Sequence, residues 1–301
     1  MAFLAFLNML FLKAVGFFLS VVLMWAAPSA SATTIEPKDA QNLRLQFGVV
    51  ADVHMETFEY FRFDGFAKTL KDMGKTRQDA LVLVGDNTMN GQPTEYIMLY
   101  GLLSRYNCAK NTLVAMGNHD LNMGAYDTPD AIARHSFFYQ SYTGLANDRP
   151  YCSREINGYT FVILGDEDPH EDCTATISQA QLDWLAGTLA AAPAGKPVFI
   201  FLHQMLGHTF GGWGEVGEQS EAIRAIVERY PNVFMFNGHA HTPQKVKQID
   251  GVTYVNLPTL LSGGENGVGF QVEAYADRVL LRARNYIAGE WLEEYEVILD
   301  V

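Results

Sequence analysis

Short hydrophobic runs recur along the chain after residue 44, and segments with helical spacing separate them. The runs are rich in β-branched and aromatic residues and are bounded by Gly, Pro, Asp or Asn, as is typical of buried strands. Six strands are predicted in this way: Leu45–Ala51, Ala80–Gly85, Thr112–Met116, Tyr159–Leu164, Val198–Leu202 and Val233–Asn237. Four helices are predicted between them: Phe61–Met73, Glu95–Arg105, Ser178–Leu189 and Glu218–Arg229. Strands that alternate with helices indicate an α/β layered fold.

The last third of the chain has a different pattern, because its strand-like runs follow one another without helices. Short turns such as Asp250-Gly251 separate them. The runs are Lys245–Ile249, Val252–Leu257, Gly269–Ala276, Val279–Asn285 and Trp291–Ile298. No linker-like stretch divides this part from the rest. We therefore expect a second sheet stacked on the first, within a single domain over residues 45–301.

Residues 1–32 have the pattern of a secretory signal peptide. An uncharged apolar run over residues 14–27 follows Lys13, and Ala30-Ser31-Ala32 matches an A-x-A cleavage site. The polar residues 33–44 would then form a linker. An uncleaved membrane anchor is the alternative, although the apolar run is short beside the roughly 20 residues that span a bilayer. We expect cleavage, a secreted or periplasmic protein, and no stable membrane span afterwards.

Composition narrows the choice of partner. The formal net charge of −13 argues against nucleic acid, because an acidic protein repels the phosphate backbone. Export would place Cys108, Cys152 and Cys173 in an oxidising compartment, where an odd number leaves at least one thiol outside any disulfide. A disulfide between Cys152 and Cys173 and three reduced thiols are both compatible with the sequence. The oligomeric state is not predicted.

Carboxylates and imidazoles follow five of the predicted strands. They are Asp52 and His54, then Asp86, then His119 and Asp120 beside Asn118, then His203, then His239 and His241. Each motif alone also fits a polar turn or a buried histidine. Their joint occurrence at strand ends is more specific, since ligands bind at that edge of open α/β sheets.

The chemistry of this set points to metal. Imidazoles, carboxylates and one amide oxygen, with no thiolate, suit Mn, Fe or Zn. Two divalent or trivalent ions about 3.5–4 Å apart can clamp the oxygens of an in-line displacement, and a water bridged between them becomes the nucleophile. Such a pair needs a bridging carboxylate, and Asp86 is the candidate.

Together the motifs resemble the signature of the calcineurin-like metallophosphoesterase superfamily, which reads D-x-H, GD, GNH-[DE], H and GH-x-H. The matching residues are Asp52-Val53-His54, Gly85-Asp86, Gly117-Asn118-His119-Asp120, His203 and Gly238-His239-Ala240-His241. The resemblance covers residues 46–242. It implies a four-layer αββα sandwich, with two mixed β-sheets flanked by helices and a dinuclear metal site.

The resemblance also implies a role for each residue. One metal would take Asp52, His54, Asp86 and His241, and the other would take Asp86, Asn118, His203 and His239. His119 would protonate the leaving group, and Asp120 would orient His119. The implied activity is hydrolysis of a small phosphate ester through a metal-bridging hydroxide.

Departures from the signature restrict the branch of the superfamily. The protein Ser/Thr phosphatase branch reads GD-x-x-DRG, but the segment Gly85 to Gly91 lacks the Arg that would hold the substrate phosphate. The purple acid phosphatase branch has an iron-ligating Tyr where Met89 stands. A small-molecule phosphatase remains, and a phosphodiesterase for cyclic or nucleotide-type diesters is the alternative. A metal-binding scaffold without turnover is a further alternative, and the presence of His119 with Asp120 argues against it.

Four features outside the signature are less specific. His208 could contact a substrate phosphate or lie at the surface, and residues 121–150 could cap the site or form a packed surface loop. The segment Gly211 to Gly214 could offer an aromatic platform through its tryptophan. His135 is expected in a solvated loop.

Overall fold

The structure is a computed structural model that describes residues 22, 34–57, 59–121, 128–168, 173–210, 215–261 and 267–301. The expected signal peptide, except Val22, and its cleavage site lie outside the described residues, as do residues 211–214. None of the helices in the described ranges has the length and apolar character that a bilayer crossing requires.

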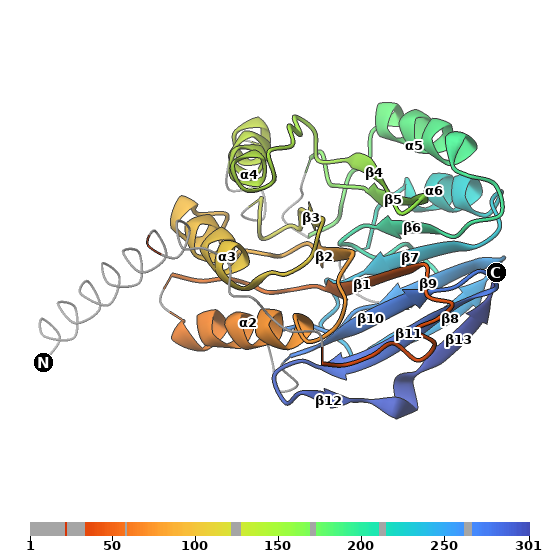
Figure 1. The fold of residues 1–301 in the computed structure, drawn as a ribbon. Coiled ribbons are helices and arrows are strands. Elements are labelled where there is room, and N and C mark those ends of the chain that lie inside the picture. Colours follow the sequence, from red (N-terminus) through yellow and green to blue (C-terminus); the bar gives the residue numbers. More distant parts are fainter. Residues whose placement is uncertain are drawn as a thin grey trace, which may run out of the picture.

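Two mixed β-sheets lie face to face in the centre of the molecule (Figure 1). In the described residues the first sheet has seven strands, in the order β12 (Glu290–Trp291), β11 (Arg278–Asn285), β10 (Val268–Ala274), β1 (Leu45–Val50), β2 (Ala80–Val84) and β3 (Thr112–Ala115), with β13 (Val297–Asp300) paired to β11. The second sheet has six, in the order β4 (Cys152–Ile156), β5 (Tyr159–Ile163), β6 (Val198–Phe201), β7 (Val233–Asn237), β9 (Val252–Asn256) and β8 (Lys245–Ile249).

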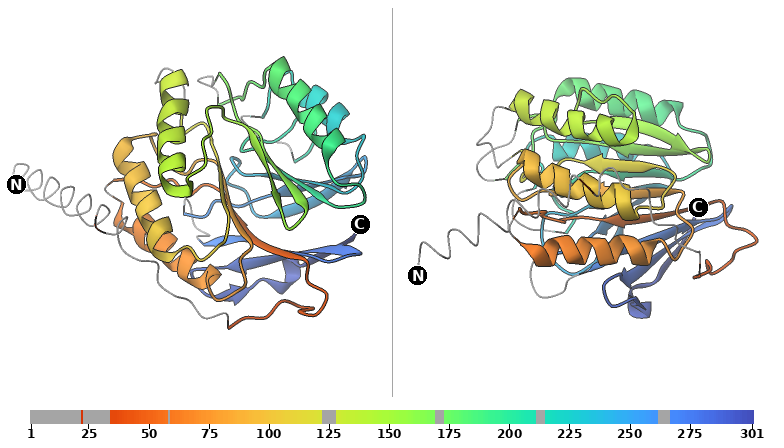
Figure 2. Two further views of the ribbon diagram at one scale, coloured as in Figure 1. Left: turned by 45° about the horizontal axis from the view of Figure 1, so that its top comes forward. Right: turned by 60° about the vertical axis from the view of Figure 1, so that its left-hand side comes forward.

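Helices cover the outer face of each sheet (Figure 2). The first sheet carries α2 (Tyr60–Met73), α3 (Pro93–Tyr106) and α4 (Thr128–Thr143), and the second carries α5 (Gln179–Ala191) and α6 (Ser220–Val227). A short 3₁₀ helix, η2 (Glu293–Tyr295), precedes β13. The expected four-layer αββα sandwich is therefore confirmed, as are the six strands and four helices predicted between residues 45 and 237. Helix α4 and strand β4 were not predicted.

The expectation that the C-terminal strands form a sheet of their own is wrong. Strand β10 pairs antiparallel with β1 and extends the first sheet, whereas β9 pairs in parallel with β7 and extends the second. The hairpins β8–β9 and β10–β11 are both present. Turn residues determine such hairpins locally, but the sheet that each hairpin joins depends on pairing with strands far away in the sequence.

An aromatic layer joins the two sheets. Phe47 of β1 lies with its ring centroid 5.0 Å from that of Phe161 and 5.0 Å from that of Phe199. The ring centroids of Phe201 and Phe236 in the second sheet lie 6.2 and 6.3 Å from that of Phe47, and both pairs are edge-to-face. Edge-to-face aromatic pairs add about 0.5–1.5 kcal/mol each beyond the area they bury. This packing fixes the ends of β1, β6 and β7 relative to one another.

The residues that lead into β1 are held against the first sheet. The backbone N–H groups of Thr34 and Ile35 both donate to the Lys75 carbonyl at the end of α2. The N–H of Lys38 donates to Glu273, and Arg278 forms an ion pair with Asp39. The segment expected as a linker is thus docked along the sheet over residues 34–44.

Candidate metal centre

The predicted ligands gather where strands from both sheets end. Because β1, β2 and β3 run parallel to one another, and β6 and β7 do too, their carboxyl ends each lie at one edge. The hydrogen bond from the Gly238 N–H to the His203 carbonyl joins the loop after β7 to the loop after β6 in the second sheet. The ring Nδ1 of His203 then lies 2.8 Å from the Val84 carbonyl, which links them to β2 of the first.

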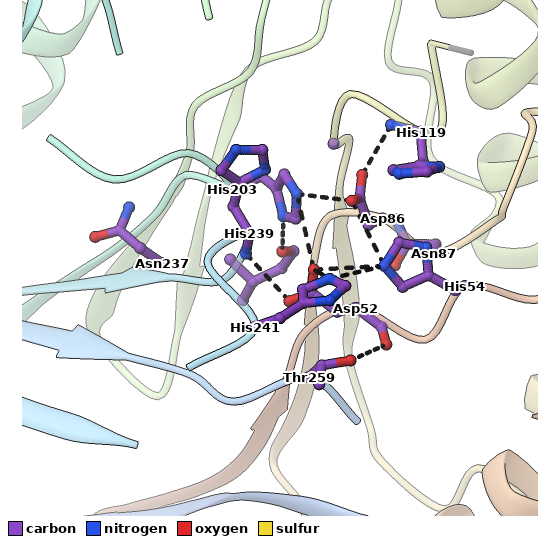
Figure 3. A network of polar contacts seen from close by, with 12 residues as sticks. Asp52, His54, Asp86, Asn87, His119, His203, Asn237, His239, His241 and Thr259 are labelled. Carbon is purple, nitrogen blue, oxygen red and sulfur yellow. Dashed lines mark hydrogen bonds and ion pairs between the residues drawn. The ribbon is translucent and has the colours of Figure 1, made fainter. Parts of the chain in front are cut away.

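One group of side chains combines residues from opposite ends of the signature. The Nε2 atom of His241 lies 3.0 Å from Asp52 Oδ1 and 3.1 Å from the Nε2 atom of His54. His54 Nε2 also lies 3.7 Å from Asp86 Oδ2. One ligand atom from each of these four residues lies within 4.8 Å of the others. Figure 3 shows the two imidazoles and the carboxylates pointing toward one another.

A second group shares Asp86 with the first. Its other members are His203 and His239, and the three ligand atoms again lie within 4.8 Å of one another. The Nε2 atom of His203 is 3.1 Å from Asp86 Oδ2. Asn118 lies between Gly117 and His119, and the N–H of His119 donates to Asp86 Oδ1 at 2.9 Å. The structure therefore brings six predicted ligands into two overlapping groups and places the seventh beside Asp86.

The two groups concentrate negative charge out of contact with water. Burial alone would raise the pKa of Asp52 and of Asp86, but the surrounding histidines hold the pKa of both carboxyls well below its usual range. Burial lowers the pKa of His203, yet the charges of Asp86 and Asp52 outweigh it and raise that pKa to about 9. Burial and the nearby His203 lower the pKa of His239 to about 4. Two buried, ionised carboxylates require positive charge between them.

The donor set fits a pair of metal ions. Asn118 Oδ1 is buried and forms no hydrogen bond with any residue that the structure describes, and neither does His203 Nε2, although Asp86 lies close by. A cation satisfies such lone pairs. Ligand atoms bound to one ion at about 2.0–2.2 Å stand about 3 Å apart, which is the spacing of His241 Nε2 from His54 Nε2 and from Asp52 Oδ1. Which residues bind metal stays a prediction.

Five of the predicted ligands have backbone φ angles in the left-handed region. They are Asp52 (57°), His54 (46°), Asp86 (47°), His239 (70°) and His241 (49°). Residues other than glycine adopt this region at a cost of about 1–3 kcal/mol each, and such strain clusters at functional sites. The remaining contacts of the loops must therefore offset it. Strand ends with ordinary turns would not need these angles.

The glycines of the signature leave room for His203. A Cβ atom on Gly85 would lie 2.5 Å from the His203 Cβ, and Gly85 also has a φ of 77°. A Cβ on Gly117 would overlap Asp86 Oδ1 and lie 2.7 Å from His203 Cδ2. On Gly238 it would lie 2.6 Å from Asp52 Oδ2. Three loops thus pack around one imidazole at distances that only glycine permits.

The Asp120 carboxylate, which was expected to orient His119, does not hydrogen-bond to the His119 imidazole. Asp120 Oδ1 accepts hydrogen bonds from Thr88, and Oδ2 accepts them from Asn87 and Gly117. The His119 ring instead places Nδ1 2.8 Å from the Met89 carbonyl, and it meets the His54 ring edge-on at 4.7 Å. This contact could not be predicted from residue types, because a backbone carbonyl is present whichever residue occupies position 89.

Other candidates lie away from the centre. His208 is exposed, and its nearest ionic partner is the exposed Glu221, at 4.0 Å. Residues 128–143 form α4, which packs against α3, and His135 on it is buried, so its assignment to a solvated loop was wrong. The helical spacing of the buried residues around His135 was not recognised in the sequence. No disulfide joins Cys152 and Cys173, both of which lie in the described part of the chain.

Comparison with known families agrees with the family that the sequence motifs resemble. Residues 45–243 match the calcineurin-like phosphoesterases. The chain belongs to the calcineurin-like phosphoesterase family. It is a metal-dependent hydrolase of phosphoric esters, and the expected resemblance is confirmed. No curated protein matches the sequence.

Solved structures share the fold at low sequence identity. A dimetal phosphatase from Danio rerio has a TM-score of 0.64 and 16% identity, with 86% of this chain and 99% of that chain covered. The purple acid phosphatase PPD1 of yellow lupin (Lupinus luteus) gives 0.63 and 13%, over 85% and 53%. GAP50, described as the anchor in the inner membrane complex of Plasmodium, gives 0.55 and 12%, over 86% and 89%. At such identities the likeness concerns the fold.

Proposed function

We propose that this calcineurin-like phosphoesterase hydrolyses small phosphate monoesters at a dinuclear metal centre. The observation that carries the proposal is the position of Asp86, whose carboxylate belongs to both ligand groups. A shared carboxylate holds two cations close together. Such a pair, when bound, polarises the phosphate oxygens and lowers the pKa of a coordinated water.

The chain's own residues would hold and orient the reacting groups. Asp52, His54, Asp86 and His241 would form one set of ligands, and Asp86, Asn118, His203 and His239 the other. The Val84 carbonyl can only accept a hydrogen bond, so His203 donates through Nδ1 and keeps Nε2 for a metal. The backbone N–H of His119 holds Asp86 Oδ1 and so orients the bridging carboxylate.

His119 is the candidate proton donor to the leaving group. Its Nδ1–H donates to the Met89 carbonyl, since a carbonyl only accepts. The other ring nitrogen is therefore the one that exchanges a proton with the leaving oxygen. Contact with the His54 ring keeps His119 beside the metal ligands. General acid catalysis of this kind contributes about 10²–10⁴-fold.

Charge and sequence support a small substrate. The net charge of −13 opposes binding to a nucleic acid. The segment after Asp86 has Asn90 where the protein phosphatase branch has an arginine for the substrate phosphate. A diesterase that acts on cyclic or nucleotide-type substrates is the alternative within the family.

A scaffold without turnover is the alternative in another class, and GAP50 is a protein of this fold that is described as an anchor. Two features support turnover in this chain. Six of the seven predicted ligands lie in two overlapping groups, and His119 stands beside them without belonging to either group.

The decisive experiment is an assay on protein loaded separately with Mn, Fe or Zn. We expect about two ions per chain and faster hydrolysis of p-nitrophenyl phosphate than of bis-(p-nitrophenyl) phosphate. A preference for the diester would favour the diesterase alternative. Two bound ions without turnover on either ester would favour the scaffold.

We propose in addition that the protein is exported and that its mature form begins at or near Thr33. The support is the apolar run over residues 14–27 and the Ala30-Ser31-Ala32 site. N-terminal sequencing of the exported protein tests this. An intact N-terminus on a membrane-bound product would favour the anchor instead.

A further inference from the structure

We propose that Asp120 is a positioning residue that acts on His119 through the backbone of residues 87–89. It would hold this loop so that the Met89 carbonyl accepts the Nδ1–H of His119, and it would not touch the imidazole itself. The inference rests on the proposed function, because it assumes that His119 transfers a proton.

The first observation is the density of hydrogen bonds at Asp120. Its carboxylate is fully buried and accepts five hydrogen bonds. The N–H and side-chain amide of Asn87 donate to Oδ2, at 3.2 and 3.0 Å, together with the N–H of Gly117, at 2.9 Å. The N–H and hydroxyl of Thr88 donate to Oδ1, at 3.0 and 2.8 Å. Every donor within this set lies in the loop or at the start of the motif that contains His119.

None of the five hydrogen bonds that Asp120 accepts comes from His119. A buried carboxylate is costly unless such bonds satisfy it. Asp120 is therefore a buried carboxylate that is not a predicted ligand, and three of its five hydrogen bonds come from the backbone N–H groups of Asn87, Thr88 and Gly117.

Met89 directly follows Thr88, so the hydrogen bonds from Thr88 to Asp120 also restrain the position of Met89. Its N–H donates to the Met55 carbonyl at 2.9 Å, and its carbonyl faces His119 Nδ1 at 2.8 Å. The far side of the loop is also held, because Glu95 accepts from the Asn90 N–H and Arg134 donates to the Gly91 carbonyl. Asp120 anchors the near side. Loss of that anchor frees the peptide that orients the imidazole.

The main test is Asp120→Asn, which keeps the size of the side chain but replaces one acceptor with a donor. We expect two ions per chain to remain bound and KM to change little. We expect kcat for an alkyl phosphate to fall by about 10²-fold, the effect of misplacing a reacting group by about 1 Å. For p-nitrophenyl phosphate the fall should be less than about tenfold, since its leaving group needs little protonation.

A double-mutant cycle separates this role from general loosening of the site. In the His119→Asn background, Asp120→Asn should cause no further loss of alkyl-ester turnover, because effects that pass through one residue are not additive. Additive losses, loss of metal, or equal losses on aryl and alkyl esters would overturn the proposal. Absence of wild-type turnover on all esters would instead refute the proposed function.

Thr88 supplies a milder matched pair if Asp120→Asn does not fold. Its hydroxyl donates to Asp120 and accepts from the Gly91 N–H, at 3.1 Å. Thr88→Val removes both bonds at nearly constant volume, and Thr88→Ser keeps them. The valine variant should show the selective alkyl-ester loss, and the serine variant should retain wild-type selectivity. Equal behaviour of the two variants would contradict the proposal.

Discussion

The Nε2 atoms of His54 and His241 lie 3.1 Å apart, although 187 positions separate the two residues in the chain. Two imidazole nitrogens at this distance repel each other unless a proton or a cation lies between their lone pairs. Asp52 and Asp86 supply the negative charge that favours a metal cation there. The packing of the two sheets therefore creates an arrangement that metal would stabilise, which leads to a first prediction.

Removal of metal should lower the thermal stability of the protein. Ligands that bind only the folded state add about 4 kcal/mol at a thousandfold excess over Kd. For a chain of this size that corresponds to a shift in Tm on the order of 10 °C. Calorimetry before and after chelation, with metal content measured in parallel, tests the shift. Unchanged Tm in a protein that never retains metal would contradict the two-metal site.

Asp86→Asn should lower both metal content and activity. An amide cannot supply the charge that two adjacent cations share, so fewer than two ions should remain bound per chain. Asp72→Asn is a suitable control, because Asp72 is also buried, pairs with Arg284 at 2.6 Å, and lies at the end of α2 that is remote from the His54 loop. Breaking that pair should cost about 3–5 kcal/mol of stability and leave two ions in place in the folded protein. Equal metal loss in both variants would contradict a specific role for Asp86.

The layers of the fold could be predicted from local patterns. Hydrophobic runs such as Ala80–Val84 are buried on both faces, and their ends coincide with the polar motifs. The assignment of β8–β13 to sheets could not be predicted in the same way. Strand β10 lies beside β1 because apolar side chains such as Phe270 and Phe47 enter one shared interior. That pairing joins residues more than 200 positions apart and leaves no local signal.

The candidate site divides in the same way. Side-chain types and their order located Asp52, Asp86 and His203, because metal binding demands particular side chains. Contacts made through the backbone were not accessible, since the carbonyls of Val84 and Met89 would be present with any residue at these positions. The hydrogen bonds of Asp120 to backbone N–H groups were inaccessible for the same reason. The family resemblance indicated that Asp120 orients His119, but it did not reveal that the hydrogen bonds of Asp120 go to Asn87, Thr88 and Gly117.

Gly117→Ala should disrupt the centre, and Gly187→Ala should not. A Cβ on Gly117 would overlap the Asp86 carboxylate. The loop would have to move, and the variant should lose metal and at least about 1–3 kcal/mol of stability. Gly187 lies within α5, and a Cβ atom added there would meet nothing within 4 Å. Alanine there should add about 0.5–1 kcal/mol. Unfolding curves and metal analysis compare the two variants, and intact metal binding by Gly117→Ala would show that the cradle is not required.

His135 should make stability fall on acidification. Burial lowers its pKa from 6.5 to about 4 in the folded state, where it packs against Tyr96 and Tyr139. Between these two values the unfolded chain binds more protons, so folding is favoured in full above pH 6.5 and the contribution is lost as pH falls toward 4. The loss is on the order of 3 kcal/mol. His135→Phe should remove this part of the pH dependence.

That measurement requires both proteins to be free of metal, since protons also displace metal from histidine ligands. Chemical denaturation at pH 7 and at pH 5 then gives the change in unfolding free energy for each. If the wild type and His135→Phe lose the same free energy, the buried imidazole is not responsible.

The last prediction separates proton transfer from metal binding. His119 belongs to neither ligand group, and its ring contacts the Met89 carbonyl and the His54 ring. His119→Asn should therefore leave about two ions per chain while kcat falls by on the order of 10²–10⁴-fold. The loss should be smallest for aryl esters, whose leaving groups depart without protonation, and largest for alkyl esters. Metal analysis and paired assays on the two ester classes test both statements. If the variant loses a metal ion, or slows the two classes equally, His119 is not the proton donor, and the Met89 contact then orients a ring with another role.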